Sequence, residues 1–157
     1  MGKATELIRH SSSLCRGMPI ERSKFEKGKD VGEMRWKSFE KAAIVSLEQR
    51  FAKRFHKRRV MLGKFREIDA VSEDGMVLAQ VKHTSKLLED FTNEKKRNYF
   101  ANYMLDALIL ERSPGSTKLL VIYPEEWKNW FVEESKGLIS PQIEVITVPW
   151  RDDGKRR

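Results

Sequence analysis

The chain has a single cysteine, Cys15, and only three histidines among its 157 residues. One thiol cannot form a disulfide within the chain, and so few thiol and imidazole groups argue against a thiolate zinc centre. No apolar run approaches the ~20 residues that a membrane-spanning helix needs, and the first ten residues lack the apolar stretch of a secretory signal. We therefore expect a protein of the reducing cytoplasm with no membrane partner.

Positive charge is in excess, since 31 lysines and arginines against 23 acids give a formal net charge of +8. This balance favours a polyanionic partner, because cations that neutralise phosphates release condensed counterions. An anionic membrane surface attracts the same charge, and solubility alone is a third explanation. Between Arg50 and Arg66 the chain carries eight lysines and arginines and no acid, which indicates a phosphate-facing patch. The predicted nucleic-acid contacts are Lys53, Arg54, Lys57, Arg58, Arg59, Lys64, Arg66 and, further on, Lys86.

Hydrophobic periodicity divides the chain into a polar N-terminal arm, a folded domain and a basic tail, at residues 1–33, 34–150 and 151–157. The arm shows no sustained period, so we expect it to be flexible or loosely docked. Helical periodicity covers 36–55, 85–112 and 124–136, and strand patterns cover 60–62, 66–72, 76–82, 118–123 and 142–148. This order predicts an α/β fold, with a mixed sheet and helices packed on its faces.

The second and third predicted strands form a hairpin, because the Asp-Gly pair at 74–75 is a strong two-residue turn signal. With that turn, Asp69 faces Gln80 and Glu67 faces Lys82. Side chains alternate between the faces of a strand, so all four lie on one face, with opposed Cβ atoms roughly 4.5–5.5 Å apart. The alternative interpretation is a half-exposed polar face with an ordinary Glu67–Lys82 ion pair.

Asp69 and Gln80 together offer oxygen ligands for a hard divalent cation, with the Lys82 ammonium beside them. Mg²⁺ often takes only one or two carboxylates from the protein, together with substrate phosphate. Such a metal polarises a phosphoryl group and lowers the pKa of a bound water. Lys82 can orient that water or stabilise charge on the phosphorus. The pattern therefore predicts phosphodiester chemistry.

With Glu40 on the preceding helix, the stretch EIDAVSEDGMVLAQVK at 67–82 resembles the PD-(D/E)xK nuclease superfamily, whose fold is the restriction-endonuclease-like fold. Within it, the stretch is most similar to archaeal Holliday-junction resolvases, to a bacterial group with a G-E-I-D…V-E-V-K signature, and to Mrr-type enzymes. The resemblance covers about 36–85, and the downstream order of elements agrees with it. It implies a core of four to five mixed strands flanked by helices.

The resemblance also implies the site. Glu40 matches the helix glutamate that completes the metal site, Asp69 matches the aspartate at the end of the second core strand, and Lys82 matches the lysine. Gln80 stands where Glu or Asp is commoner, although Mrr-type members carry Gln there. The implied activity is that of a deoxyribonuclease dependent on Mg²⁺ or Mn²⁺, with Glu40, Asp69, Gln80 and Lys82 catalytic and the first three holding the metal.

Several alternatives remain open from the sequence. Glu48 lies two turns from Glu40 on the same predicted helix, and we favour Glu40 as the ligand. Because Gln80 removes a negative charge, a non-catalytic nucleic-acid-binding protein with the same fold is the rival class, and an RNA-directed nuclease is a third. One site cuts one strand, so cleavage of a duplex predicts a homodimer, with the N-terminal arm or the long helix at 85–112 as its interface.

Overall fold

The computed structural model describes residues 23–151, with side chains from Arg35 onward. Along these residues, no helix combines the length and the apolar character needed to cross a membrane. The elements, in chain order, are α1 (Ser23–Phe51), β1 (Phe55–Leu62), β2 (Lys64–Ser72), β3 (Val77–His83), the short 3-10 helix η1 (Leu88–Asp90), α2 (Asn93–Arg112), β4 (Thr117–Tyr123), α3 (Glu125–Glu134) and β5 (Ile143–Ile146). The predicted order of helices and strands is confirmed.

The five strands form one mixed sheet in the order β1-β2-β3-β4-β5. The first three strands pair antiparallel, as tight hairpin connections require, and β3, β4 and β5 pair parallel. Helices α2 and α3 make the two parallel crossovers. The prediction of an α/β fold with a mixed sheet is thereby confirmed.

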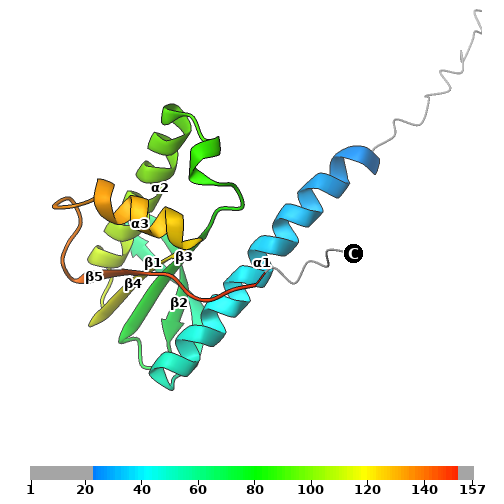
Figure 1. Cartoon of the computed structure of the whole chain (residues 1–157). Helices are drawn as coiled ribbons and strands as arrows, with labels where there is room; N and C mark the ends of the chain where they lie inside the picture. The colour runs from blue at the N-terminus through cyan, green and yellow to red at the C-terminus, as the bar shows by residue number, and fades with distance from the viewer. Residues whose placement is uncertain (1–22, 152–157) are drawn as a thin grey trace, which may run out of the picture.

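Each face of the sheet has its own apolar core. Figure 1 shows α2 and α3 on one side of the sheet and α1 on the other. Helices α2 and α3 cover one face, where Leu110, Trp127 and Phe131 pack on side chains of the strands. Helix α1 covers the other face through Phe39 and Leu47, joined there by side chains of the C-terminal segment after β5. The sheet is therefore the middle layer of three, as the nearly continuous apolar stretches of β3 and β4 require.

Helix α1 is longer than predicted at its start and shorter at its end. It begins at Ser23 rather than near residue 36, so part of the predicted arm is helical; residues 1–22 and 152–157 lie outside the described residues. It ends at Phe51 because Ala52 adopts a positive φ of 52°, the left-handed geometry that commonly terminates helices. Of the four residues after Phe51 that were predicted helical, three therefore form the turn before β1 and the fourth is the first residue of that strand.

The predicted helix at 85–112 is wrong over its first turns. The segment after β3 is a loop containing η1, and α2 begins only at Asn93. Thr92 is the N-cap, because its side chain accepts a hydrogen bond from the Lys95 backbone N–H. The Trp127 indole donates to the Lys86 carbonyl at 2.9 Å, which holds the loop against α3.

Candidate functional site

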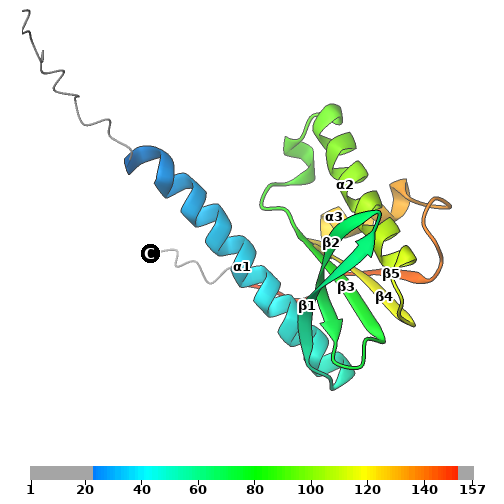
Figure 2. The same cartoon turned by 180° about the vertical axis from the view of Figure 1, so that it is seen from behind.

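Strands β2 and β3 pair in the predicted register near their turn and separate beyond it. Val71 faces Leu78 and Ala70 faces Ala79, as the Asp-Gly turn predicts. Beyond these pairs the side chains of Asp69 and Gln80 connect the strands. Figure 2 shows the hairpin of β1 and β2 twisting away from the rest of the sheet in this region.

Gln80 uses its amide to join the two strands. Its Oε1 accepts from the Asp69 backbone N–H at 3.1 Å, and its Nε2 donates to the Glu67 carbonyl at 3.0 Å. The side chain is only 3% exposed. Its oxygen is thus already bound within the sheet, which disfavours the predicted role as a metal ligand and makes Gln80 a residue that positions Asp69.

A β-bulge changes the direction of the β2 side chains where β2 and β3 separate, next to Asp69. Arg58 on β1 pairs with Ile68 and His56 pairs with Val71, so the single residue Lys57 stands opposite both Asp69 and Ala70. Bulges of this kind are frequent next to active sites, where they turn a side chain out of the regular alternation. Here the bulge breaks the pattern that the sequence predicted for one face of β2.

Because of the bulge, the four predicted residues do not share one face. Glu67 lies with Lys57, at 3.5 Å between carboxylate and ammonium, whereas Lys82 pairs with Asp106 of α2 at 2.8 Å. The prediction that Glu67 and Lys82 face one another is therefore wrong. Asp69 lies between the two pairs, and its Oδ2 accepts from the Val81 backbone N–H at 2.8 Å.

Glu40 is the α1 glutamate on the side of Asp69. Its carboxylate is 7% exposed and lies 2.6 Å from the Lys57 ammonium, a contact that raises the pKa of Lys57. Glu48 instead accepts from the Phe55 backbone N–H at 3.2 Å, near the end of α1. The choice of Glu40 over Glu48 agrees with this placement.

Asp106 is a site residue that the sequence reasoning missed. It lies on the buried stripe of α2 with Tyr103, Ala107 and Leu110, and burial raises its pKa although Lys82 opposes the shift. A carboxylate at helical spacing among apolar residues was the signal that could have identified it, since buried acids are nearly always paired. Leu108, two residues further along α2, is exposed.

Asp69 is the most strongly perturbed acid of the site. Its pKa is raised from the ordinary 3.8 to about 6, first by burial and further by the charges of Glu40 and Asp106, while the Val81 N–H and Lys82 act in the opposite direction. A half-buried carboxyl of this kind, with specific charge partners, is a candidate functional group. The raised pKa means that the Val81 N–H and Lys82 do not fully offset the cost of burying the ionised Asp69 carboxylate.

The fit of a metal to these residues is partial. In the part of the chain that the structure describes, no group of three or more His, Cys, Asp or Glu side chains is arranged to hold an ion. The Glu40 carboxylate is close enough for its charge to raise the pKa of Asp69, and a cation near the two carboxylates would oppose that effect. This donor set suits Mg²⁺, which needs few protein ligands.

The predicted nucleic-acid contacts divide into paired and unpaired cations. Lys57 is held by Glu40, and Lys53 lies 2.6 Å from Asp74, so both are engaged within the protein. The remaining strand and turn residues of the basic run are exposed, apart from the half-buried Arg66 on β2, and Lys86 is exposed on the loop after β3. The exposed cations of the run are Arg54, Arg58, Arg59 and Lys64.

No protein-family model, curated protein or solved structure matches the chain. The residues gathered around Asp69 are therefore the basis for the functional conclusion.

Proposed function

We propose that the protein is a metal-dependent endonuclease that hydrolyses phosphodiester bonds in DNA on a restriction-endonuclease-like core. The observation that carries this proposal is Asp69, a half-buried carboxyl with a raised pKa at the point where β2 and β3 separate. Lys82 on β3 and Glu40 on α1 stand close enough to shift that pKa. Acid, lysine and helix glutamate are the three groups that the resemblance to PD-(D/E)xK nucleases assigns to the site.

Asp69 and Glu40 would hold Mg²⁺ or Mn²⁺, which supplies charge for the phosphoryl oxygens and a more acidic bound water. Asp69 keeps one oxygen for this task, because its Oδ2 already accepts from the Val81 N–H. The Oε1 atom of Glu40 becomes available when Lys57 releases it. We infer that Lys57 makes this exchange by moving to a substrate phosphate.

Lys82 carries the positive charge nearest to Asp69 on β3. Asp106 holds its ammonium at 2.8 Å, and the lysine side chain remains 32% exposed. An ammonium fixed in this way can stabilise the charge that develops on the phosphoryl oxygens without reorganising. Asp106 is accordingly a positioning residue, and Lys82 the group that contacts substrate.

Binding of the DNA backbone is assigned to the exposed cations of the basic run. Arg58 and Arg59 lie on β1, directly beside β2 and its bulge, so a strand bound along them passes the site. One site cuts one strand, and a pair of protomers would be needed to cut both. Nicking by single protomers is the simplest activity that this arrangement supports.

A second function is favoured by one specific observation. The Gln80 oxygen is bound to the Asp69 N–H, which leaves two carboxylates at the site and, within the described part of the chain, no group of three acids, histidines or cysteines that could hold a metal. A protein that only binds nucleic acid, through the same fold and charge, would need no more than this. The two functions differ in a single measurable outcome, which is cleavage.

The test is incubation of supercoiled plasmid, linear duplex, single-stranded and branched DNA, and RNA with Mg²⁺, Mn²⁺ or EDTA. We expect metal-dependent nicking of DNA that Asp69→Asn abolishes. Glu48→Gln is the control, because it removes a carboxylate from the same helix as Glu40 but near the end of α1, where Glu48 accepts from the Phe55 backbone N–H. Absence of cleavage with either metal at any concentration would leave the binding function.

A further inference from the structure

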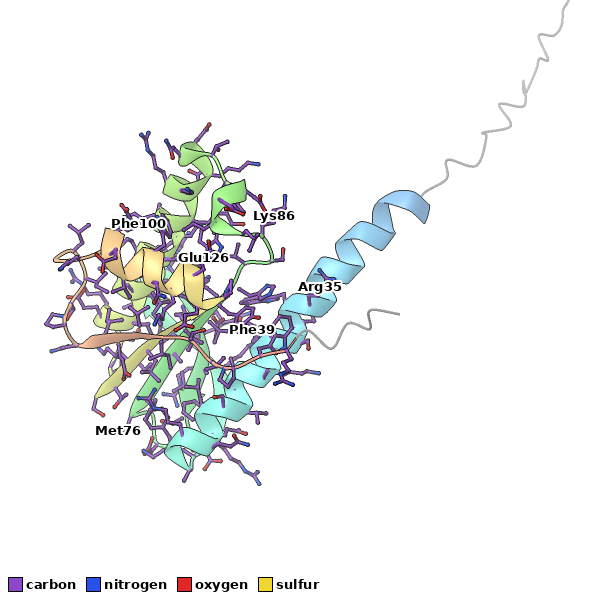
Figure 3. The ribbon with its side chains drawn as sticks, viewed as in Figure 1. Arg35, Phe39, Met76, Lys86, Phe100 and Glu126 are labelled. Carbon is purple, nitrogen blue, oxygen red and sulfur yellow. The ribbon has the colours of Figure 1, made fainter. Side chains whose placement is uncertain are left out.

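A cavity of about 770 Å³ lies next to the candidate site, between α1, the loop after β3 and the first turns of α2. No aspartate or glutamate among the described residues lines it. Figure 3 labels Arg35 on α1 and Lys86 on the loop, two of the side chains around it. Its walls carry the cations Arg35, Lys86 and Lys95 and the aromatic rings of Trp36, Phe91 and Tyr99.

The aromatic wall is built into the fold. The Phe91 and Tyr99 rings meet edge to face at 5.2 Å, and Trp127 packs against both. Trp127 also binds the Lys86 carbonyl, so the loop that carries Lys86 is fixed to the same cluster. The cavity is therefore formed by packed side chains and is available without rearrangement.

The cavity continues from the candidate site along three of the elements that carry the site, β3, α1 and α2. On β3, His83 and Thr84 line it directly after Lys82. On α1, Trp36 lies one helical turn before Glu40. On α2, Tyr99 precedes Asp106 by two turns, about 10 Å at 1.5 Å per residue. A chain bound at the site would reach the cavity within one or two nucleotides.

We propose that this cavity holds an unpaired nucleotide of the DNA strand beside the cleaved bond, an inference that rests on the proposed nuclease function. Lys86 and Lys95 suit phosphate, since no aspartate or glutamate among the described residues lines the cavity. Flat rings suit a base, whose stacking on aromatic side chains is the general mode of single-strand binding. A base within an intact duplex cannot enter, since it is stacked and paired. The substrate class is thus DNA with a single-stranded segment at a branch, flap or end.

The first test measures binding in EDTA, where no cleavage occurs. The probes are a blunt duplex, the same duplex with a short single-stranded extension, and that extension carrying one abasic position at the junction. We expect the extended duplex to bind more tightly than the blunt one, and the abasic position to weaken binding by roughly 5- to 100-fold, the range for one lost base stack. Equal affinity for all three probes would overturn the proposal.

The second test uses a charge-matched pair of double variants on the extended duplex. Lys86→Gln with Lys95→Gln should lower the salt slope by about 1.4, at about 0.7 per lost single-strand contact, and remove the preference for the extension. Lys96→Gln with Arg97→Gln is the control, because these two α2 residues line a different hollow beside Trp130. The same loss in the control would place the nucleotide elsewhere.

The two proposals fail separately. A protein that prefers the extended duplex in EDTA but never cleaves would overturn the nuclease function and support the cavity as a nucleotide site. A protein that cleaves blunt and extended duplex equally, and binds them with equal affinity, would support the nuclease function. It would overturn the proposal that the cavity holds an unpaired nucleotide.

Discussion

At the scale of single residues, Asp69 makes the protein less stable when it is ionised. Its pKa is raised from 3.8 to about 6 in the folded protein, so the folded state binds the proton more tightly than the unfolded chain does. The penalty is absent below about pH 4, where both states are protonated, and is complete above about pH 6. By linkage it amounts to at most about 3 kcal/mol at neutral pH.

Asp69→Asn should therefore be more stable than the natural protein at pH 7, by up to about 3 kcal/mol, with the difference vanishing near pH 3.5. Asparagine keeps an oxygen that can accept from the Val81 N–H and lacks the charge. Urea unfolding across this pH range measures the difference. Glu89→Gln, which removes an exposed carboxylate from η1, is the control; a constant offset for Asp69→Asn would contradict the assigned cause.

The same carboxyl predicts the pH dependence of cleavage. Metal ligands must be deprotonated, so protons compete with the cation for Asp69. At a fixed, limiting Mg²⁺ concentration the rate should rise as pH passes from 5 to 7, by roughly tenfold per pH unit below the pKa of about 6. Saturating metal should move this rise to lower pH. A rate that is flat over the range at limiting metal would exclude Asp69 as the ligand.

Variants of Lys82 and Asp106 distinguish a role of Lys82 in folding from a role in catalysis. Lys82→Met should cost about 1–3 kcal/mol of unfolding free energy, because it leaves a buried carboxylate without its partner. Adding Asp106→Asn should recover most of that loss, as measured by chemical denaturation. The double variant should nevertheless remain unable to nick plasmid. Recovery of cleavage along with stability would show that Lys82 acts only through folding.

At the scale of elements, the separation of β2 and β3 depends on the Gln80 amide. Gln80→Glu replaces the donor to the Glu67 carbonyl by a second acceptor and should cost about 1–3 kcal/mol at neutral pH. Stability should return in acid, once the new carboxyl is protonated and can donate. Gln80→Met, the control, should lose similar stability without this recovery.

The metal dependence of the Gln80→Glu protein shows whether residue 80 only joins β2 and β3 or also binds the metal. The sequence predicts that an added carboxylate binds the metal and lowers the concentration needed for half-maximal cleavage. The hydrogen bonds of Gln80 predict a less stable protein without that gain. A fully stable Gln80→Glu protein that cleaves at lower metal concentration would restore Gln80 as a ligand.

The sequence was sufficient for elements whose pattern is local. The Asp-Gly turn determined the register of β2 and β3, and the periods of apolar residues determined the order of helices and strands. The bulge at Asp69 could not be predicted, because it depends on which β1 residues pair with β2. Since a single extra residue reverses the faces along a strand, the predicted partners of Glu67 and Lys82 changed with it.

At the scale of the whole molecule, the net charge is +8, but we expect only a few of the positive side chains to determine how DNA binding depends on salt. Arg58 and Arg59 are exposed whereas Lys53 is engaged by Asp74, so Arg58→Gln with Arg59→Gln should lower the salt slope of duplex binding by about 0.9 to 1.8, at about 0.9 per lost contact. Lys53→Gln should leave the slope nearly unchanged. Anisotropy titrations between 50 and 200 mM salt measure both. Equal slopes for all proteins would place the DNA on another face.

Strand β1 has a further consequence because it is the first strand of the sheet and leaves one row of backbone groups open. Open edges pair readily with other chains, and lysine or arginine on an edge strand opposes that pairing. Lys57, Arg58 and Arg59 are exposed along this edge, whereas the opposite edge, β5, is only four residues long. Self-association should therefore increase as these cations are removed, so the charges proposed to bind DNA also keep protomers from aggregating edge to edge.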